Sequence, residues 1–275
     1  MLGALYGDIV GSRYEFKGGL APKGFTLFHQ DCKCTDDSLM TLAVADALVA
    51  CRSDMSHYER TLCDSMRRIA HLHPNVGWGS KFHEWLFDFE VPAPINSYGN
   101  GAGMRIAPVG WVRDTLEETK ELSYRTTVVS HSHPEGLKGA EAVAVCVYLA
   151  RTGHSKEEIK EAAVSYYPEI RDMTFAGLKA SGYGLDPFGS WITCQGSIPQ
   201  AIVCFLDSDS LEDAVRKAVY LAADTDTQAC MAGAIAEAYY GLSYEDEDNV
   251  MAYVPKDLQS ICFAFRSIQK KRVKR

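Results

Sequence analysis

The sequence predicts an all-α protein built as a single compact multi-helix domain over residues 1–275. Apolar residues recur at helical spacing along most of the chain, and no run of alternating polar and apolar residues marks a strand. The breaks between helical segments are short compared with a domain linker, so one domain is the simplest arrangement. With 47% hydrophobic residues, the chain has enough apolar side chains for a packed core.

Composition and charge argue against several classes of function. The net charge of −8 disfavours a general nucleic-acid or acidic-membrane binder, because binding phosphates requires a basic surface. The N-terminus lacks the basic region of a signal peptide, and no apolar stretch reaches the roughly 18 residues of a membrane helix. The nine cysteines are scattered and mostly set in apolar runs, which fits reduced thiols. We therefore expect a cytoplasmic protein with no membrane partner.

The first helical segments are separated by a loop that carries Glu15. Residues 3–11 indicate a short helix with small residues that permit close packing, and residues 12–30 indicate a surface loop. A longer helix is predicted from Asp36, because apolar residues then repeat as pairs four apart. Asp36 and Asp37 at its start suit either helix capping or a metal site. Helical patterns follow at residues 58–72 and 80–89.

A glycine-rich break at residues 92–103 runs directly into a predicted helix at Met104 and Arg105. Backbone N–H groups ahead of a helix can bind phosphate oxygens. The alternative is a simple turn, because the loop has neither the preceding strand of a dinucleotide-binding motif nor a P-loop lysine. After a predicted helix at residues 116–129, His131 and His133 lie in a turn, where helix capping is more ordinary than zinc binding.

The second half of the chain is also helical. Residues 139–149 are apolar on all sides, which predicts a central buried helix, and Ser155 with Glu158 predicts a capping box for an amphipathic one. Residues 168–195 are the longest irregular stretch and could line a substrate entrance. Helices are predicted at 199–206 and 211–222. Residues 245–248 indicate a solvated acidic turn, residues 258–268 a last helix, and residues from about 269 to 275 a basic tail.

Two Thr/Asp clusters lie far apart in the sequence, each at a predicted helix start: residues 35–37 and residues 224–227. Thr225 and Gln228 have the spacing of a capping box, which would let Asp224 and Asp226 converge on one point. The four carboxylates of both clusters would repel one another unless cations balance them. Two divalent ions would do so, and a ligand set made only of oxygen favours Mg²⁺, with Mn²⁺ or Ca²⁺ as substitutes.

These motifs resemble those of the ADP-ribosylglycohydrolases, relatives of dinitrogenase reductase-activating glycohydrolase. The resemblance extends from Gly3 to about Gly241 and implies an all-α domain with two Mg²⁺ ions at the base of a cleft. It rests on Gly7-Asp8-Ile9-Val10-Gly11 with Tyr14-Glu15-Phe16, on Thr35-Asp36-Asp37-Ser38, on Ser97-Tyr98-Gly99-Asn100-Gly101 with Met104-Arg105, on Ser130-His131-Ser132-His133-Pro134, on Ser197-Ile198-Pro199 and on Asp224-Thr225-Asp226-Thr227.

The resemblance also implies roles for individual residues. The implied metal ligands are Thr35, Asp36, Asp37, Asp224, Asp226 and Thr227. The implied ADP-ribose cleft is lined by Gly79, Ser97, Tyr98, Gly99, Asn100, Gly101 and His131, with the glycine-rich loop receiving the diphosphate. Glu15 is similar to the family's mobile-loop glutamate, so the expected catalytic residues are Glu15, Asp36 and Asp226. Ala222-Ala223 replaces the usual Gly-Gly and Cys34 replaces a common aromatic residue, which bears on cleft shape more than on metal binding.

The expected function is Mg²⁺-dependent hydrolysis of the N- or O-glycosidic bond between ADP-ribose and a modified acceptor, foremost arginine on a protein. Such an enzyme releases ADP-ribose and reverses mono-ADP-ribosylation. Serine-linked, DNA-linked and O-acetyl-ADP-ribose are alternative substrates. A non-catalytic ADP-ribose-binding or structural protein is a second hypothesis, against which the intact set of metal-ligating residue types argues. A zinc or redox site at Cys32 and Cys34 ranks last, because no further ligands have suitable spacing.

Overall fold

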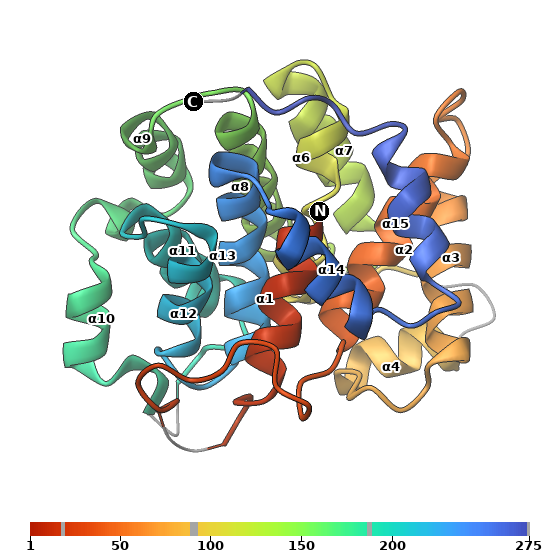
Figure 1. Cartoon of the computed structure of the whole chain (residues 1–275). Coiled ribbons are helices and arrows are strands. Elements are labelled where there is room, and N and C mark those ends of the chain that lie inside the picture. Colours follow the sequence, from red (N-terminus) through yellow and green to blue (C-terminus); the bar gives the residue numbers. More distant parts are fainter. Residues whose placement is uncertain (18–19, 89–92, 186–188, 274–275) are drawn as a thin grey trace.

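The computed structural model describes residues 1–17, 20–88, 93–185 and 189–273, which form helices joined by loops (Figure 1). Within these ranges, extended pairing is limited to two isolated β-bridges, Ile95 with His131 and Gly99 with Thr193. The prediction of an all-α fold is confirmed. None of the helices in the described part of the chain is long and apolar enough to cross a membrane.

The helices are best followed in chain order, with two short 3₁₀ helices labelled η. They are α1 (Leu2–Ser12), α2 (Asp36–Ala50), α3 (Tyr58–Leu72), α4 (Ser80–Phe87), α5 (Gly101–Met104), α6 (Val109–Val112), α7 (Leu116–Val128), α8 (Pro134–Arg151), α9 (Lys156–Tyr166), η1 (Pro168–Arg171), α10 (Phe175–Ser181), η2 (Tyr183–Leu185), α11 (Cys194–Leu206), α12 (Leu211–Val219), α13 (Thr225–Tyr240), α14 (Tyr244–Tyr253) and α15 (Gln259–Arg266).

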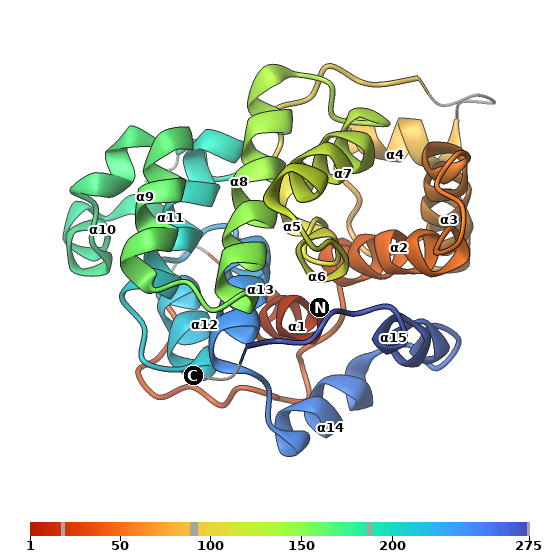
Figure 2. The ribbon, with the colours of Figure 1, turned by 90° about the horizontal axis from the view of Figure 1, so that it is seen from above.

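Helices α1 and α13 lie side by side at the centre of the molecule and are surrounded by the other helices (Figures 1 and 2). All eleven residues of α1 are buried. Glycines permit the close approach: a Cβ added to Gly7 would lie only 1.9 Å from the backbone oxygen of Ala229. The expected short helix with small residues is therefore present, and it joins the beginning of the chain to a helix near its end.

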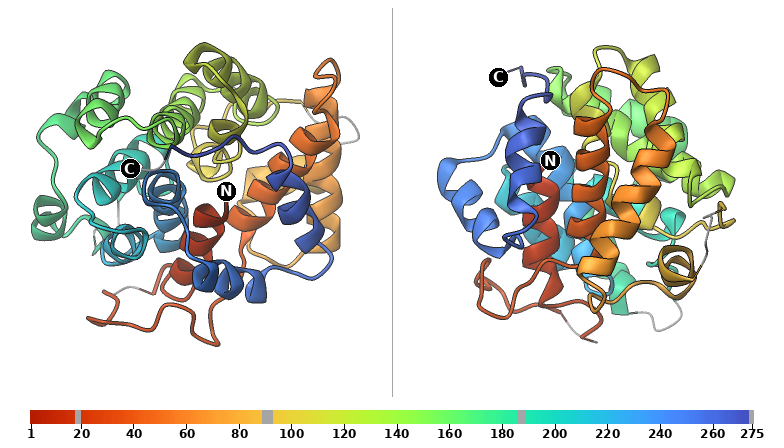
Figure 3. Two further views of the ribbon diagram at one scale, coloured as in Figure 1. Left: turned by 45° about the horizontal axis from the view of Figure 1, so that its top comes forward. Right: turned by 90° about the vertical axis from the view of Figure 1, so that its right-hand side faces the viewer.

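The remaining helices form two groups around this central pair. On one side, α2 packs against both α3 and α15 (Figure 3). On the other side, α8, α11 and α12 pack against α13. Twelve of the eighteen residues of α8 are buried, in agreement with the prediction of a central buried helix there.

Side-chain caps explain where many of these helices begin. The Ser155 hydroxyl accepts a hydrogen bond from the backbone N–H of Glu158, and the Glu158 carboxylate accepts one from the backbone N–H of Ser155. The predicted capping box is therefore present. His133 caps α8 by accepting from the N–H of Glu135. A capping role for this histidine agrees with the ordinary interpretation of its position in the sequence. Each such bond satisfies one of the N–H groups that a helix start leaves unpaired.

Two segments near the C-terminus, residues 245–248 and the basic tail, have a different structure from the one predicted. The acidic residues 245–248 belong to α14 rather than to a turn, because Ser243 caps the helix and accepts from the N–H of Asp246. Carboxylates in a first turn also interact favourably with the helix dipole. The tail residues 270–273 pack against the body of the protein: Lys270 N donates to Trp111 O, and Val273 N donates to Arg151 O. Residues 274–275 of the predicted tail lie outside the described residues.

Helix positions around the two irregular stretches also differ from the prediction. The helix expected at Met104 ends there instead, because α5 is a four-residue helix formed by the glycine-rich segment itself. Helix α11 begins at Cys194, five residues before Pro199, since Thr193 caps it by accepting from the N–H of Gly196. The described part of residues 168–195 includes η1, α10 and η2 as well as loop. Residues 18–19, 89, 92 and 186–188 of the predicted segments lie outside the described ranges.

All nine cysteines lie within the described residues and are free thiols. The Sγ atoms of Cys32 and Cys34 donate weak hydrogen bonds to the backbone oxygens of Leu27 and Tyr253. Neither thiol belongs to a group of ligand-capable side chains in the described part of the chain.

Candidate functional site

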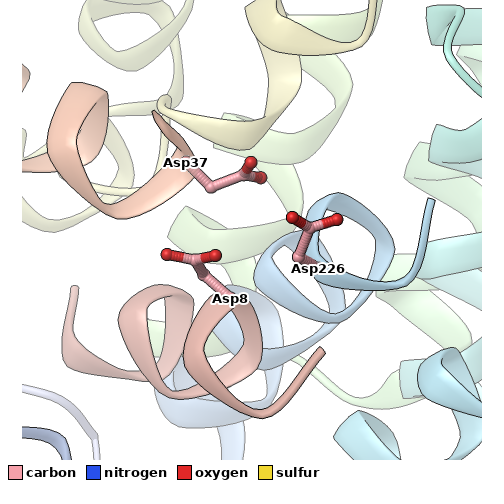
Figure 4. Close-up of side chains that lie close together, drawn as sticks. All are labelled: Asp8, Asp37 and Asp226. Atoms are coloured by element: carbon pink, nitrogen blue, oxygen red, sulfur yellow. The ribbon is translucent and has the colours of Figure 1, made fainter. Parts of the chain in front are cut away.

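Carboxylates from three helices meet at one point of the fold (Figure 4). Asp8 of α1, Asp37 at the start of α2 and Asp226 at the start of α13 each have an oxygen atom within 4.8 Å of the other two. A second group of the same compactness comprises Glu15, Asp224 and Asp226. Asp226 belongs to both groups and links them. The two sequence clusters, residues 35–37 and 224–227, are thus brought together as predicted.

Helix α2 is held at the site by a carboxylate from α1. Asp8 accepts hydrogen bonds from the backbone N–H groups of Thr35 and Ser38 at 3.0 and 3.1 Å, and from the Thr35 hydroxyl at 2.6 Å. Thr35 is also the N-cap of α2 and accepts from the N–H of Asp37. Because these bonds fix the first turn of α2, they determine where Asp36 and Asp37 lie.

Helix α13 begins at Thr225, and Asp224 is its N-cap residue without a capping side-chain bond. The predicted capping box of Thr225 and Gln228 is therefore wrong. Thr225 lies inside the helix and donates its hydroxyl proton to Gly11 O at 2.8 Å, which fastens α13 to α1. The Thr227 hydroxyl donates to Oδ2 of Asp37 at 3.2 Å and so joins the starts of α13 and α2.

The backbone just before Asp224 has an uncommon conformation. Ala222 and Ala223 both have φ of +65°, in the left-handed region that residues with a Cβ seldom adopt. These are the two positions where Gly-Gly was noted as usual for the family. The conformation makes the chain turn sharply between α12 and α13, and the backbone oxygen of Ala223 accepts from Phe16 N at 2.9 Å. That bond brings the loop that carries Glu15 next to Asp224.

The carboxylates of the site are difficult to ionise together. Burial, followed by repulsion from neighbouring carboxylates, raises the pKa of Asp36, Asp37 and Asp226 well above the usual range. Burial also raises the pKa of Asp8, Asp224 and Glu15. Bringing so many acids into a buried site is unfavourable unless protons or cations neutralise them.

The chemistry of these side chains fits a hard divalent cation. Every ligand-capable atom in the two groups is a carboxylate oxygen, the type that Mg²⁺ prefers. Asp37 is 1% exposed, yet its Oδ1 has no hydrogen-bond partner among the described residues. An unpaired buried carboxylate oxygen is costly. A cation bound between Asp37 and Asp226 would satisfy it.

Two of the six predicted metal ligands, Thr35 and Asp36, lie less clearly in the cluster than the other four. Asp36 is partly exposed and lines the cleft, but it belongs to neither of the two compact carboxylate groups. The hydroxyl of Thr35 donates to Asp8 and accepts from the N–H of Asp37, so one of its two lone pairs is already occupied within the protein. Asp37, Asp224, Asp226 and Thr227 converge as the sequence predicts.

A cleft of about 380 Å³ lies above the carboxylates. Its walls include residues from distant parts of the chain, and every member of the two carboxylate groups except Asp8 lines it. The predicted site residues that line it are Glu15, Asp36, Asp37, Gly79, Ser97, Gly99, Asn100, Gly101, His131, Asp224, Asp226 and Thr227. Tyr98 does not line this cleft: its side chain is 46% exposed and its ring lies edge-on to His133, with ring centres 5.2 Å apart.

The glycine-rich loop is hydrogen-bonded both to Asp224 and to the segment just before α11. The Asn100 amide donates to Oδ2 of Asp224 at 2.7 Å and to Trp191 O at 3.1 Å. The N–H of Asn100 donates to Ile192 O, and the N–H of Gly99 donates to the hydroxyl oxygen of Ser97. Two of the N–H groups expected to face a phosphate are therefore already used within the protein.

Asp8 was quoted in a motif but was not predicted as a site residue. The signal was present, because a carboxylate interrupts an otherwise apolar helix that is now seen to be buried on all sides. A fully buried aspartate in such a helix must have polar partners. Its partners, Thr35 and Ser38, lie outside the local sequence, which is why spacing within the first helix could not reveal them.

Comparisons with known proteins agree with this geometry. A sequence model described as ADP-ribosylglycohydrolase matches residues 1–250. The ADP-ribosylhydrolase ARH3 of Gallus gallus is 28% identical, covering 98% of this chain and 89% of that protein. The ADP-ribosylarginine hydrolase Tri1 of Pseudomonas putida (strain GB-1) is 26% identical, covering 88% of this chain and 70% of that protein.

The fold is also found among solved structures. A chain of an ADP-ribosylglycohydrolase-related protein complex superposes with a TM-score of 0.69, covering 97% of this chain and 95% of that chain. At 20% sequence identity, this similarity shows a shared fold and nothing further.

Proposed function

The chain belongs to the ADP-ribosylglycohydrolase family of hydrolytic enzymes, and from this premise we propose that it removes ADP-ribose from arginine on modified proteins in a Mg²⁺-dependent reaction. The observation that carries the proposal is the meeting of two carboxylate groups at the floor of a cleft whose wall is a glycine-rich loop. A relative named as an ADP-ribosylarginine hydrolase supports arginine as the acceptor.

Two Mg²⁺ ions would be held by Asp37, Asp224, Asp226 and Thr227, with Thr35 and Asp36 at the edge of the set. Bound there, Mg²⁺ would orient sugar hydroxyl groups and act as a Lewis acid. Asp8 would position these ligands, since the hydrogen bonds that it accepts from Thr35 and Ser38 fix the start of α2. Mn²⁺ could replace Mg²⁺, because the ligand set offers oxygen only.

The chain's own side chains would handle the protons. Asp36 lines the cleft without being tied into either compact carboxylate group, so its carboxylate is placed to accept the proton of the attacking water. Glu15 is half-buried beside Asp224 and Asp226 and also lines the cleft. Its carboxyl group would pass a proton to the departing acceptor. The transition state at the anomeric carbon has oxocarbenium character, which surrounding carboxylates stabilise.

The charge of the site favours a cationic acceptor. Six carboxyl groups gather here, namely Asp8, Glu15, Asp36, Asp37, Asp224 and Asp226, whereas two divalent ions supply four positive charges. The surplus is negative and would attract the guanidinium of ADP-ribosylarginine more than the neutral O-glycoside of ADP-ribosylserine. Phe16, 52% exposed beside Glu15, offers an aromatic face on which a guanidinium can stack.

Parallel assays on arginine-linked, serine-linked and DNA-linked ADP-ribose, at saturating Mg²⁺, test the choice of acceptor. We expect release of ADP-ribose from the arginine-linked peptide at a kcat/KM at least about tenfold above the others, because desolvated cation contacts contribute more than 1.4 kcal/mol. Preferential release from the serine-linked peptide would contradict the charge argument. Binding of ADP-ribose without release from any of the three would instead indicate a binding protein.

A further inference from the structure

Arg105 is a buried cation next to the cleft. It follows α5 directly and is 0% exposed. Its guanidinium donates to Gly101 O at 3.0 Å and to the Oγ of Ser130 at 2.6 Å, and it lies 5.5 Å from the centre of the Phe82 ring. Its Nε has no hydrogen-bond partner, and no carboxylate pairs with it, among the described residues. A buried charge held only by neutral groups is costly, which points to a specific role.

The hydrogen bonds of Arg105 have a fixed direction because a guanidinium can only donate. The Oγ of Ser130 accepts from Arg105, which leaves the Ser130 hydroxyl proton free to donate to Nδ1 of His131, 2.9 Å away. A guanidinium nitrogen of Arg105 also lies 3.3 Å from the same Nδ1. Arg105, which can only donate, therefore requires Nδ1 of His131 to be an acceptor, and the Ser130 hydroxyl is free to donate to the same atom. In a neutral imidazole the proton must then be on Nε2.

The Nε2 atom of His131 faces the glycine-rich loop. It lies 3.4 Å from a Cβ built on Gly101 and 3.9 Å from one built on Gly99, which are ordinary contact distances and place the ring nitrogen directly beside the loop. His131 itself lines the cleft. Burial, and then the charge of Arg105, lowers the pKa of His131 well below its usual value, so the ring stays neutral. The loop thus has a side-chain N–H donor at a place where the N–H groups of Gly99 and Asn100 are already used.

We propose that Arg105 is a positioning residue that holds His131 in its Nε2–H form, so that His131 donates a hydrogen bond to a diphosphate bound over the glycine-rich loop. The buried guanidinium also places positive charge behind the loop, which a bound anion would neutralise. The identity of the anion rests on the proposed function, whereas the form of His131 is a property of the free protein and is measured independently.

The first experiment determines the form of His131 in the ligand-free protein from its imidazole ¹⁵N chemical shifts. His131→Gln assigns the signal among the eight histidines. We expect the Nε2–H form in the wild type, and loss of that preference in Arg105→Met, where neither Ser130 nor Nδ1 of His131 accepts a hydrogen bond from residue 105. Arg151→Met is the matched control, because Arg151 is 5% exposed but donates to the backbone oxygens of Gly110 and Arg113, outside the cleft. An Nδ1–H or doubly protonated His131 in the wild type would overturn the proposal.

The second experiment measures the affinity for ADP-ribose by calorimetry in the same variants. We expect Arg105→Met to weaken binding about tenfold, Arg105→Lys to restore part of the loss because lysine can still donate to Ser130, and Arg151→Met to leave the affinity unchanged. Wild-type affinity in Arg105→Met would overturn the role of Arg105 in binding. If the wild type showed no affinity for ADP-ribose, the proposed function would fail, and the ¹⁵N shifts would still decide the form of His131.

Discussion

Asp226 is the residue on which the site depends most directly. It belongs to both groups of carboxylates, it is 2% exposed, and its Oδ1 accepts only from the adjacent Thr227 N–H among the hydrogen bonds of the described residues. Burial and the charges of Asp37 and Asp224 raise its pKa well above the usual range. Without a cation, this side chain destabilises the fold, because its charged form is repelled by its neighbours.

Replacing Asp226 with Asn tests whether its charge destabilises the metal-free fold, because Asn has nearly the same shape as Asp. In the presence of a chelator, we expect Asp226→Asn to raise the free energy of unfolding by about 1–3 kcal/mol, since one charge leaves a repelling buried cluster. We also expect Mg²⁺ to stabilise the wild type and not the variant, as required for a ligand that binds the native state. Thermal unfolding measures both effects. Asp248→Asn, at an exposed position of α14, is the matched control.

The pH dependence of the Mg²⁺ effect follows from the same pKa shifts. An acid with a raised pKa in the folded state stabilises that state most at low pH, and this contribution is lost as the pH rises through the folded pKa. Metal-free protein should therefore lose stability at these carboxylates as the pH rises above the unfolded carboxylate pKa of about 4. Mg²⁺ binding requires deprotonated ligands and becomes stronger over the same range.

We accordingly expect the difference in melting temperature between Mg²⁺ and chelator to widen from about pH 6 to about pH 8. Measuring this difference removes the contribution of titrating groups that do not interact with Mg²⁺, because they contribute equally in both conditions. A difference that stays constant with pH, or narrows, would show that the carboxylates do not bind the ion.

At the scale of elements, the contact of α1 with α13 positions the site. A Cβ on Gly11 would lie 2.5 Å from Cα of Asp226 and 2.5 Å from Thr225 O. The same contact is fastened by the hydroxyl of Thr225, which donates to Gly11 O. Because the clash involves backbone atoms, no side-chain rotation can relieve it.

Replacing Gly11 with Ala should consequently displace the start of α13. We expect it to destabilise the fold by about 1–3 kcal/mol or more and to weaken activation by Mg²⁺, because Asp226 moves with the backbone. Thermal unfolding and a Mg²⁺ titration of activity measure the two effects. Gly79→Ala is the matched control for stability, since a Cβ there has no atom within 4 Å. Equal stability of both variants would contradict the close approach of the two helices.

The turn between α12 and α13 offers a test in the opposite direction. Ala222 and Ala223 both adopt φ of +65°, where glycine costs less than alanine. We expect Ala223→Gly to raise the free energy of unfolding by about 0.5–1 kcal/mol. Ala180→Gly, at an exposed helical position of α10, should lower it by about 1 kcal/mol. A destabilising Ala223→Gly would show that this turn is not strained.

Helices with a clear apolar pattern were predicted well, whereas the caps were predicted correctly at Ser155 but not at Ser243 or Thr225. The paired apolar residues after Asp36 and the uniformly apolar residues 139–149 correspond to α2 and α8. The acidic residues 245–248 have no such period, and they form a helix because Ser243 caps it. Likewise, Thr225 had the spacing of a cap, but the nearby backbone oxygen of Gly11 gave its hydroxyl a tertiary partner instead.

At the scale of the whole molecule, the site exists because distant segments meet. Asp8 and Glu15 come from the first residues of the chain, Asp37 from α2, Asn100 from the glycine-rich loop and Asp226 from α13. The chemistry of the two Thr/Asp clusters was enough to predict that they share a site. The support given by Asp8 and the chain of hydrogen bonds from Arg105 to His131 depend on tertiary contacts, so no local spacing in the sequence could reveal them.

The central claim is that these carboxylates hold the Mg²⁺ on which hydrolysis depends. Its most direct test is the rate of ADP-ribose release from an ADP-ribosylarginine peptide, measured as a function of free Mg²⁺ for the wild type and for Asp226→Asn. We predict no release in chelator, full recovery when Mg²⁺ is added to the wild type, and a loss of at least about a thousandfold in Asp226→Asn at any Mg²⁺ concentration. Undiminished release in chelator, or wild-type turnover by Asp226→Asn, would contradict the claim.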